Sequence, residues 1–219
     1  MTKTDKILSI MAVILIGGGF IGTPIVNGYS NLVEFYQDVY GRMNSETLSG
    51  TVYLKNVPIY LEGNVNFTQY DLDKLTEDVP DVLLQNVSEI YICDFKDQNA
   101  ICYQFTDENL TDAQGCIVYN GSGRLFIDIN ATNKTNTIIH EAMHRYDEVN
   151  GLSDTQLVKD LFNTNSSYVV SETKENAQKN EKEFLSESAV LYFTNPQKLQ
   201  NQNLQPVYDY FQSLFHYYS

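Results

Sequence analysis

Apolar and polar residues alternate through much of the first half of the chain. Residues 49–66 place apolar side chains at alternate positions, which predicts extended structure. Residues 87–93 and 101–105 are two further strand candidates. Residues 68–76 instead have helical spacing, which stops before Pro80. We therefore expect this half to form a small sheet together with one helix.

The second half opens with a hairpin pattern and continues as helix. Apolar residues 117–119 and 124–129 flank an Asn-Gly-Ser-Gly turn at 120–123, which is a strong hairpin signal. From Thr135 the spacing is helical nearly to the end of the chain. Interruptions of the helical region are expected at three places: near Gly151, at residues 163–167 and near Pro196. Strands followed by helices predict an α+β domain, and the sequence has no internal repeat or long linker.

The candidate chemistry lies at residues 140–144, which read His-Glu-Ala-Met-His, an HExxH sequence. On a helix His140 and His144 lie one turn apart on the same face, so both imidazoles can reach one metal ion. Zinc takes about four ligands, and a catalytic site leaves one position for water. Glu141 lies beside that face, where it can take a proton from the attacking water. Because the chain has only 3 histidines, this spacing is improbable as a random arrangement.

The helix around this sequence has an apolar face and a histidine face. At about 100° per residue, one stripe contains the apolar residues Ile138, Ile139, Ala142, Met143, Tyr146 and Val149. His140 and His144 fall on the opposite face together with Asp147. Two ordinary core histidines would lie within the stripe. The geometry indicates a helix that packs by its apolar back and lines a cleft with its histidines.

An HExxH sequence supplies two metal ligands, so a third must come from elsewhere. Residues 183–193 are apolar nearly all round the helix they predict, which indicates burial, and they contain no Lys or Arg. A buried carboxylate is costly without a cation, so we expect Glu183 to bind the metal. Glu187, one turn later, would accept the ring N–H of a ligating histidine. The alternatives are an acidic pair at an exposed helix edge, and His216, whose aromatic surroundings favour a packing role instead.

The two segments together resemble the catalytic domain of anthrax lethal factor and the related secreted Pro-Pro endopeptidases. That family has His-Glu-x-x-His-x-x-Asp, followed by Asn-Glu-x-Glu-Phe-Phe-Ala-Glu. Here residues 140–147 read His-Glu-Ala-Met-His-Arg-Tyr-Asp, and residues 180–187 read Asn-Glu-Lys-Glu-Phe-Leu-Ser-Glu. The resemblance covers residues 45–219, with its specific motifs after residue 139. It implies a zincin-like fold, in which a small mixed or antiparallel sheet is followed by a mostly helical half that carries the metal site.

The resemblance also implies roles for individual residues. The zinc ligands it implies are His140, His144 and Glu183. Glu141 would be the general base, and Glu187 and Asp147 would support the ligands from behind. The resemblance thus implies the site of a gluzincin-type metalloendopeptidase, which would hydrolyse peptide bonds of a protein or peptide substrate.

Two positions depart from the family pattern. Met143 stands where the family often has a glycine before the second histidine. Asn176 stands seven residues before Glu183, where the family usually has a tyrosine that stabilises the oxyanion. Tyr168 lies further upstream and takes that role if residues 172–179 are an insertion. A site without such a tyrosine would lose about 100- to 1000-fold in turnover.

Three other functions compete with peptide hydrolysis as interpretations of this sequence. In the peptidase, Glu141 returns its proton to the leaving amine, and we expect residues 124–129 to bind substrate as an added strand. The alternative is a catalytically inactive metal-binding module that acts as a secreted or surface binding protein, which Asn176 favours. Polar residues within 133–150 exclude a membrane-embedded protease. A structural zinc site is disfavoured because Glu141 directly follows the first histidine.

Charge and the N-terminal pattern indicate where such a protein works. The chain has 14 Lys and Arg against 28 Asp and Glu, and its net charge of −14 repels nucleic acids and anionic lipids. Two lysines precede an apolar run over 7–26, which predicts a signal peptide or membrane anchor at residues 1–28. An N-terminal helix at 29–44 and the zincin-like domain at 45–219 would follow. This part would be secreted or lie on the outer face of the membrane, in an oligomeric state that the sequence leaves open.

The 3 cysteines fit an exported protein. Cys93 and Cys102 flank a short loop and are placed to close a disulfide, which leaves over Cys116. Three buried thiols are the alternative. The sequence has no Cys-x-x-Cys and no Cys/His cluster, which argues against a thiolate metal site.

Overall fold

The computed structural model describes residues 41, 45–63, 65–106, 109–173 and 175–215. The segment predicted at 1–28 and the residue His216 lie outside these ranges, as does all of the helix predicted at 29–44 except Gly41. Among the helices of the described ranges, none combines the length and the apolar character needed to cross a membrane.

A five-stranded mixed sheet forms the first half of the described unit. In spatial order its strands are β1 (Gly50–Leu54), β2 (Val57–Leu61), β3 (Glu89–Cys93), β5 (Arg124–Asp128) and β4 (Gly115–Ile117). The central pairs β2–β3 and β3–β5 are parallel, and the outer pairs β1–β2 and β5–β4 are antiparallel. The predicted strands at 49–66 and 87–93 and the predicted hairpin at 117–129 are therefore confirmed.

Two short helices make the crossover that the parallel β2–β3 pair requires. They are α3 (Gln69–Asp78) and α4 (Asp81–Leu84). The helix predicted at 68–76 is confirmed, and a reciprocal cap begins it: the Thr68 side chain accepts from the Asp71 amide, and the Asp71 carboxylate accepts from the Thr68 amide at 2.9 Å.

The strand predicted at 101–105 is wrong, because Ile101–Gln104 forms a 3-10 turn, η1. The Ile101 amide donates to the Glu62 carboxylate at 3.0 Å, and the Tyr103 hydroxyl donates to the Phe95 carbonyl at 2.7 Å. These contacts bind the segment to the loop before it and to the residue that follows β2. Tertiary hydrogen bonds thus outweigh the strand preference of its β-branched and aromatic residues.

The prediction that residues 124–129 bind substrate as an added strand is also wrong. Strand β5 pairs with β3 on one side and with β4 on the other, so both of its edges are already hydrogen-bonded. The preceding strand of the same hairpin, β4, is the terminal strand of the sheet. The edge of the sheet at this hairpin therefore lies one strand earlier in the sequence.

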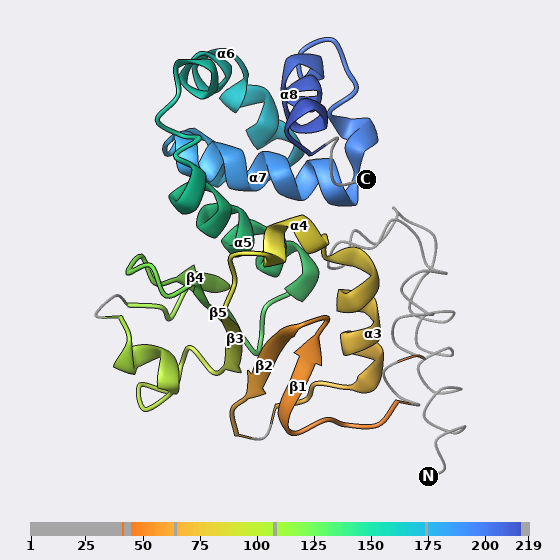
Figure 1. Cartoon of the computed structure of the whole chain (residues 1–219), viewed down its shortest axis with the longest axis vertical. Coiled ribbons are helices and arrows are strands. Elements are labelled where there is room, and N and C mark those ends of the chain that lie inside the picture. The colour runs from red at the N-terminus through yellow and green to blue at the C-terminus, as the bar shows by residue number, and fades with distance from the viewer. Residues whose placement is uncertain (1–40, 42–44, 64, 107–108, 174, 216–219) are drawn as a thin grey trace, which may run out of the picture. The chain divides into compact units, whose positions relative to one another are not determined.

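Four longer helices form the second half, as predicted. They are α5 (Lys134–Asn150), α6 (Gln156–Glu172), α7 (Glu181–Thr194) and α8 (Gln205–Phe215), with 3-10 turns η2 (Glu175–Gln178) and η3 (Pro196–Lys198) between them. Figure 1 shows α5 lying between the sheet and α7, with α6 and α8 on the far side of α7. The interruptions predicted near Gly151 and Pro196 are confirmed, since Gly151 ends α5 at φ 64°.

The interruption predicted at 163–167 is wrong, because α6 continues through these residues. The Asn165 side chain is buried and donates to the Asn203 carbonyl, so this polar residue is satisfied inside the fold. Val158, Leu161 and Val169 form the buried side of the same helix. The polar residues at 163, 164 and 167, which are typical of a loop, here lie on the solvent-exposed face of an amphipathic helix.

The core lies between the sheet and the helices. The predicted apolar stripe of α5 is buried through Ile138, Ile139, Ala142, Met143 and Tyr146, whereas Val149 near its end is exposed. Helix α7 is buried over most of its length, as predicted, through Phe184, Leu185, Ser186, Ser188, Ala189, Val190 and Leu191. The two helices that carry the candidate chemistry are therefore the most central ones.

Cys93, Cys102 and Cys116 are thiols, not disulfides, in the structure. Cys93 and Cys102 are fully buried in a small apolar cluster with Phe95 and Phe126. Burial raises the pKa of both thiols. The structure thus corresponds to the second of the two cysteine alternatives, although Cys116 is only partly buried.

We expect a thiol reagent such as DTNB to react with the native protein at Cys116 alone, because the thiolate is the reactive form and burial suppresses it at Cys93 and Cys102. Alkylation in denaturant without reductant, followed by intact mass measurement, should label all 3 cysteines. A single label under those conditions would show a Cys93–Cys102 disulfide instead.

Candidate metal centre

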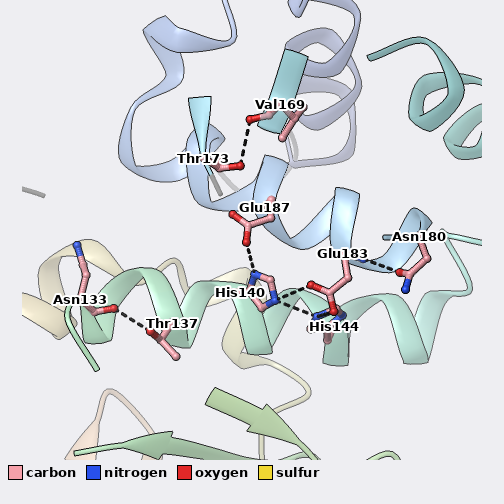
Figure 2. A network of polar contacts seen from close by, with 9 residues as sticks. All are labelled: Asn133, Thr137, His140, His144, Val169, Thr173, Asn180, Glu183 and Glu187. Atoms are coloured by element: carbon pink, nitrogen blue, oxygen red, sulfur yellow. Dashed lines mark hydrogen bonds and ion pairs between the residues drawn. The ribbon is translucent and has the colours of Figure 1, made fainter. Parts of the chain in front are cut away.

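Helices α5 and α7 place the predicted ligands on their facing sides (Figure 2). Helix α5 begins at Asn133, whose side chain accepts the Asn136 amide at 3.0 Å. Helix α7 begins at Asn180, whose side chain accepts the Glu183 amide at 2.9 Å. Both are N-caps, which satisfy backbone donors that the helix itself leaves unpaired. The cap of α7 therefore fixes the backbone of Glu183 directly.

His140, His144 and Glu183 point toward one another between the two helices (Figure 2). The histidine Nε2 atoms are 3.1 Å apart, and the Glu183 oxygens lie 3.4 Å from Nε2 of His140 and 3.6 Å from Nε2 of His144. Atoms that bind one zinc ion tetrahedrally at about 2.0–2.1 Å lie roughly 3.3–3.4 Å apart. The three side chains therefore fit a tetrahedral metal site and leave one position for a further ligand.

The protonation of these groups suits a cation. Burial lowers the pKa of His144 to about 3, so its imidazole is neutral and offers a lone pair. Burial raises the pKa of Glu183, but the hydrogen bond with His140 and the nearby positive charges of His140 and Lys179 lower it by more, so the pKa lies below its ordinary value and the carboxylate is ionised. For His140, burial lowers the pKa, but Glu183, Glu141 and Glu187 together raise it by more, so the net pKa lies above its ordinary value. A bound dication would displace the proton from the ring nitrogen that it takes.

Glu141 lies on the side of α5 that faces β4. Its side chain is buried, and burial raises its pKa to about 7, while the charge of His140 opposes the shift. A group with a pKa near the working pH is suited to take up and return a proton.

Gly115 of β4 lies directly against Glu141. A Cβ atom at this position would lie 2.8 Å from Oε1 of Glu141 and 2.6 Å from Cγ2 of Thr137. Glycine is therefore the residue that lets the edge strand approach this carboxylate. Sequence reasoning missed Gly115, because a single glycine outside a turn gives no local signal of such an approach.

The two predicted supporting carboxylates lie in different surroundings. Oε1 of Glu187 is 3.6 Å from Nδ1 of His140, so it faces the ring nitrogen that a metal at Nε2 would leave available (Figure 2). Asp147 is buried, and its Oδ1 accepts the Ser153 amide at 2.7 Å, which anchors the loop after α5. Nδ1 of His144 is buried and has no hydrogen-bond partner among the residues that the structure describes. A supporting role for Asp147 at a ligand stays a prediction.

The structure does not bring Tyr168 to these residues. Tyr168 lies on α6, 43% exposed, and its backbone carbonyl accepts from the Ser171 hydroxyl. Asn176 lies in η2, where its carbonyl accepts the Lys179 amide. In the part of the chain that the structure describes, no hydrogen bond, ion pair or ring contact joins either side chain to the three candidate ligands.

Tyr119 is a residue of the site that sequence reasoning missed. Its ring lies edge-to-face on the ring of His144, with centroids 6.3 Å apart. Nζ of Lys182 lies 5.2 Å from the centre of the same ring. Burial, and then the charges of Glu141 and Glu183, raise the pKa of the Tyr119 phenol. In the sequence this tyrosine only ends a strand before a turn, so no local pattern marks it.

No protein-family model and no curated protein matches the chain. Among solved structures, its fold is similar to that of the Pro-Pro endopeptidase PPEP-2 from Paenibacillus alvei, with a TM-score of 0.56. The match covers 74% of this chain and 99% of that chain, with 17% sequence identity. The predicted zincin-like α+β fold, and the resemblance to the Pro-Pro endopeptidases at the level of the fold, are confirmed.

Replacing Glu183 with Gln removes the charged oxygen donor of the three-residue group. After loading with zinc and dialysis, we expect about one zinc ion per wild-type chain and about a tenth of that or less in the variant, measured by mass spectrometry. Glu181→Gln is the matched control, since it removes the same charge from the same helical turn and should retain zinc. Equal zinc in both variants would contradict the ligand assignment.

Gly115→Ala should destabilise the fold by about 1–3 kcal/mol, because the added methyl group overlaps Glu141 and Thr137. Urea unfolding measures the change. Thr137→Ser removes the contacting Cγ2 and keeps the hydroxyl that donates to the Asn133 carbonyl, so the double variant should recover part of the loss. Additive losses in the double variant would show that this contact is not the cause.

Proposed function

We propose that this chain is an exported zinc-dependent endopeptidase that hydrolyses peptide bonds of a protein substrate. The observation that carries the proposal is the position of Glu141, which directly follows His140 on α5, lies against Gly115 of the edge strand β4 and interacts electrostatically with His140 and Glu183. A proton acceptor, a candidate metal site and a strand edge meet at one place. These are the three elements that hydrolysis of an extended peptide requires.

The chemistry assigns a separate task to each residue. A zinc ion bound by His140, His144 and Glu183 would supply a Lewis acid that polarises the scissile carbonyl and lowers the pKa of water. Glu141 takes a proton from the water that attacks the carbonyl carbon, and then passes it to the amide nitrogen as the C–N bond breaks. Glu187 faces Nδ1 of His140 and would hold that ring in its ligating orientation.

The edge of β4 is the place at which a peptide would bind. It is the terminal strand of the sheet, so its outer backbone groups can pair with an added strand. Because Gly115 brings β4 against Glu141, a peptide paired with β4 would pass beside the carboxylate. The peptide's own backbone would then provide most of the binding, which suits a protein substrate in extended form.

The N-terminal sequence supports a location outside the cell membrane, and the net charge indicates which substrates are favoured. Two lysines followed by the apolar run at 7–26 are typical of a signal peptide or anchor, which would place the catalytic part outside the cell membrane. A net charge of −14 favours neutral or cationic substrate segments and disfavours nucleic acids.

Glu141→Gln tests the enzyme. The full-length, zinc-loaded chain is incubated with a peptide library, and cleavage is detected by mass spectrometry. The variant should keep its zinc but cleave about 100- to 10,000-fold more slowly, since it lacks the proton acceptor. Glu181→Gln is again the control and should cleave at the wild-type rate.

Retained cleavage in Glu141→Gln would reject Glu141 as the general base. A wild-type chain that binds zinc and cleaves no peptide of the library would instead favour the inactive metal-binding module.

A further inference from the structure

The loop between β4 and β5 reaches from the sheet to the candidate metal centre. Tyr119 on this loop contacts the His144 ring on one side and has Lys182, of the first turn of α7, over its face. A cation 5.2 Å from a ring centre is within the range of an attractive cation–π contact. The phenol thus bridges the sheet half and the helical half beside the three candidate ligands.

The loop is held in place by α5. Nε of Arg145 donates to the Asn86 carbonyl at 3.0 Å, and its Nη2 donates to the Gly121 carbonyl at 3.1 Å. Gly123 closes the same turn at φ 72°, and a Cβ there would meet the Asn86 carbonyl oxygen at 2.4 Å. Arg145 directly follows His144, so the helix that carries two ligands also positions the loop that carries Tyr119.

Hydrolysis of a peptide needs a hydrogen-bond donor where negative charge develops. When water adds to the carbonyl carbon, a C–O bond forms and the carbonyl π electrons move to the oxygen, and a donor aimed at that oxygen accelerates the step. The guanidinium of Arg145 is occupied by two carbonyls and by Glu148. Tyr168 and Asn176 make no contact with the site among the described residues. Tyr119 does, and 52% of its surface is open to an incoming peptide.

We propose that Tyr119 is a catalytic residue whose phenol O–H donates a hydrogen bond to this oxygen; the inference rests on the proposed peptidase function. The proton stays on the phenol throughout, and an ordinary tyrosine is protonated at neutral pH. When the carbonyl re-forms, the C–N bond breaks and the amine takes its proton from Glu141. In this role the hydroxyl has to come within hydrogen-bond distance of the scissile carbonyl when substrate binds, and catalytic hydrogen bonds often tighten only in that complex.

Tyr119→Phe is the decisive variant, because it removes one hydroxyl and keeps the ring that contacts His144 and Lys182. With the full-length zinc-loaded chain and a peptide that the library shows to be cleaved, kcat should fall about 100- to 1000-fold. KM and zinc content should stay at the wild-type values. Tyr53→Phe, on the strand at the opposite edge of the sheet, is the control and should leave kcat unchanged.

Binding gives a second readout that does not depend on turnover. In a phosphinic analogue of the same peptide, a tetrahedral phosphinate replaces the scissile bond and mimics the charged oxygen. Calorimetry should show that Tyr119→Phe weakens binding of this analogue by a factor similar to its loss in kcat.

Four results would overturn the proposal. Unchanged kcat and unchanged phosphinate affinity in Tyr119→Phe would show that the hydroxyl takes no part. A loss confined to Tyr168→Phe would restore the tyrosine predicted from the sequence. Loss of zinc in Tyr119→Phe would show that the residue supports His144 and does not act on substrate. A wild-type chain that cleaves no peptide would reject the peptidase function itself. That failure is distinct from the others, because it appears in the wild type and not only in a tyrosine variant.

Discussion

Two imidazoles and three carboxylates share the space between α5, α7 and the edge of the sheet, and this concentration of ionisable groups is the constraint on which the rest depends. Removing one ion from water costs several kcal/mol even after a protein relaxes around it. A divalent cation held by His140, His144 and Glu183 would offset that cost at the place where it arises. Capping contributes as well, because Asn180 sets Glu183 in the first turn of α7, where the helix dipole favours a negative charge.

The packing follows from the need to hold these groups still. Helix α5 is covered by the sheet on one side and by α7 on the other (Figure 1), so neither ligand helix can shift without disturbing the core. Helix α5 is buried and carries ionisable side chains, so its position has to be fixed by close packing. Gly115 contributes to this packing, because it lets the backbone of β4 lie against Glu141. The site is thus a junction of two helices and one strand edge, whose spacing the apolar residues around it determine.

The parts of the molecule that could be predicted are those whose cause is local or electrostatic. His140 and His144 follow from helical spacing alone, and Glu183 follows from the cost of a carboxylate in an apolar helix. The predictions failed where contacts between distant residues decide the structure. The Glu62 carboxylate accepts a hydrogen bond from the segment at 101–105, which forms a turn and not a strand. Strand β4 pairs with the edge of residues 124–129 that was expected to bind substrate. Gly115 and Tyr119 could not be found, since each matters only through residues far from it in the sequence.

The role proposed for Tyr119 concerns which element of the chain supplies the hydrogen-bond donor to the oxyanion. The oxygen that becomes negative during hydrolysis is located by the metal ligands and the attacking water, so any chain segment that reaches this point can supply its donor. In the helical half Asn176 stands seven residues before Glu183, and among the described residues the nearest upstream tyrosine, Tyr168, makes no hydrogen bond or ring contact with the ligands. The β4–β5 loop reaches the site from the opposite side, on a turn that Arg145 binds to the ligand helix. In this chain the candidate ligands therefore come from α5 and α7, while the proposed donor comes from the β4–β5 loop.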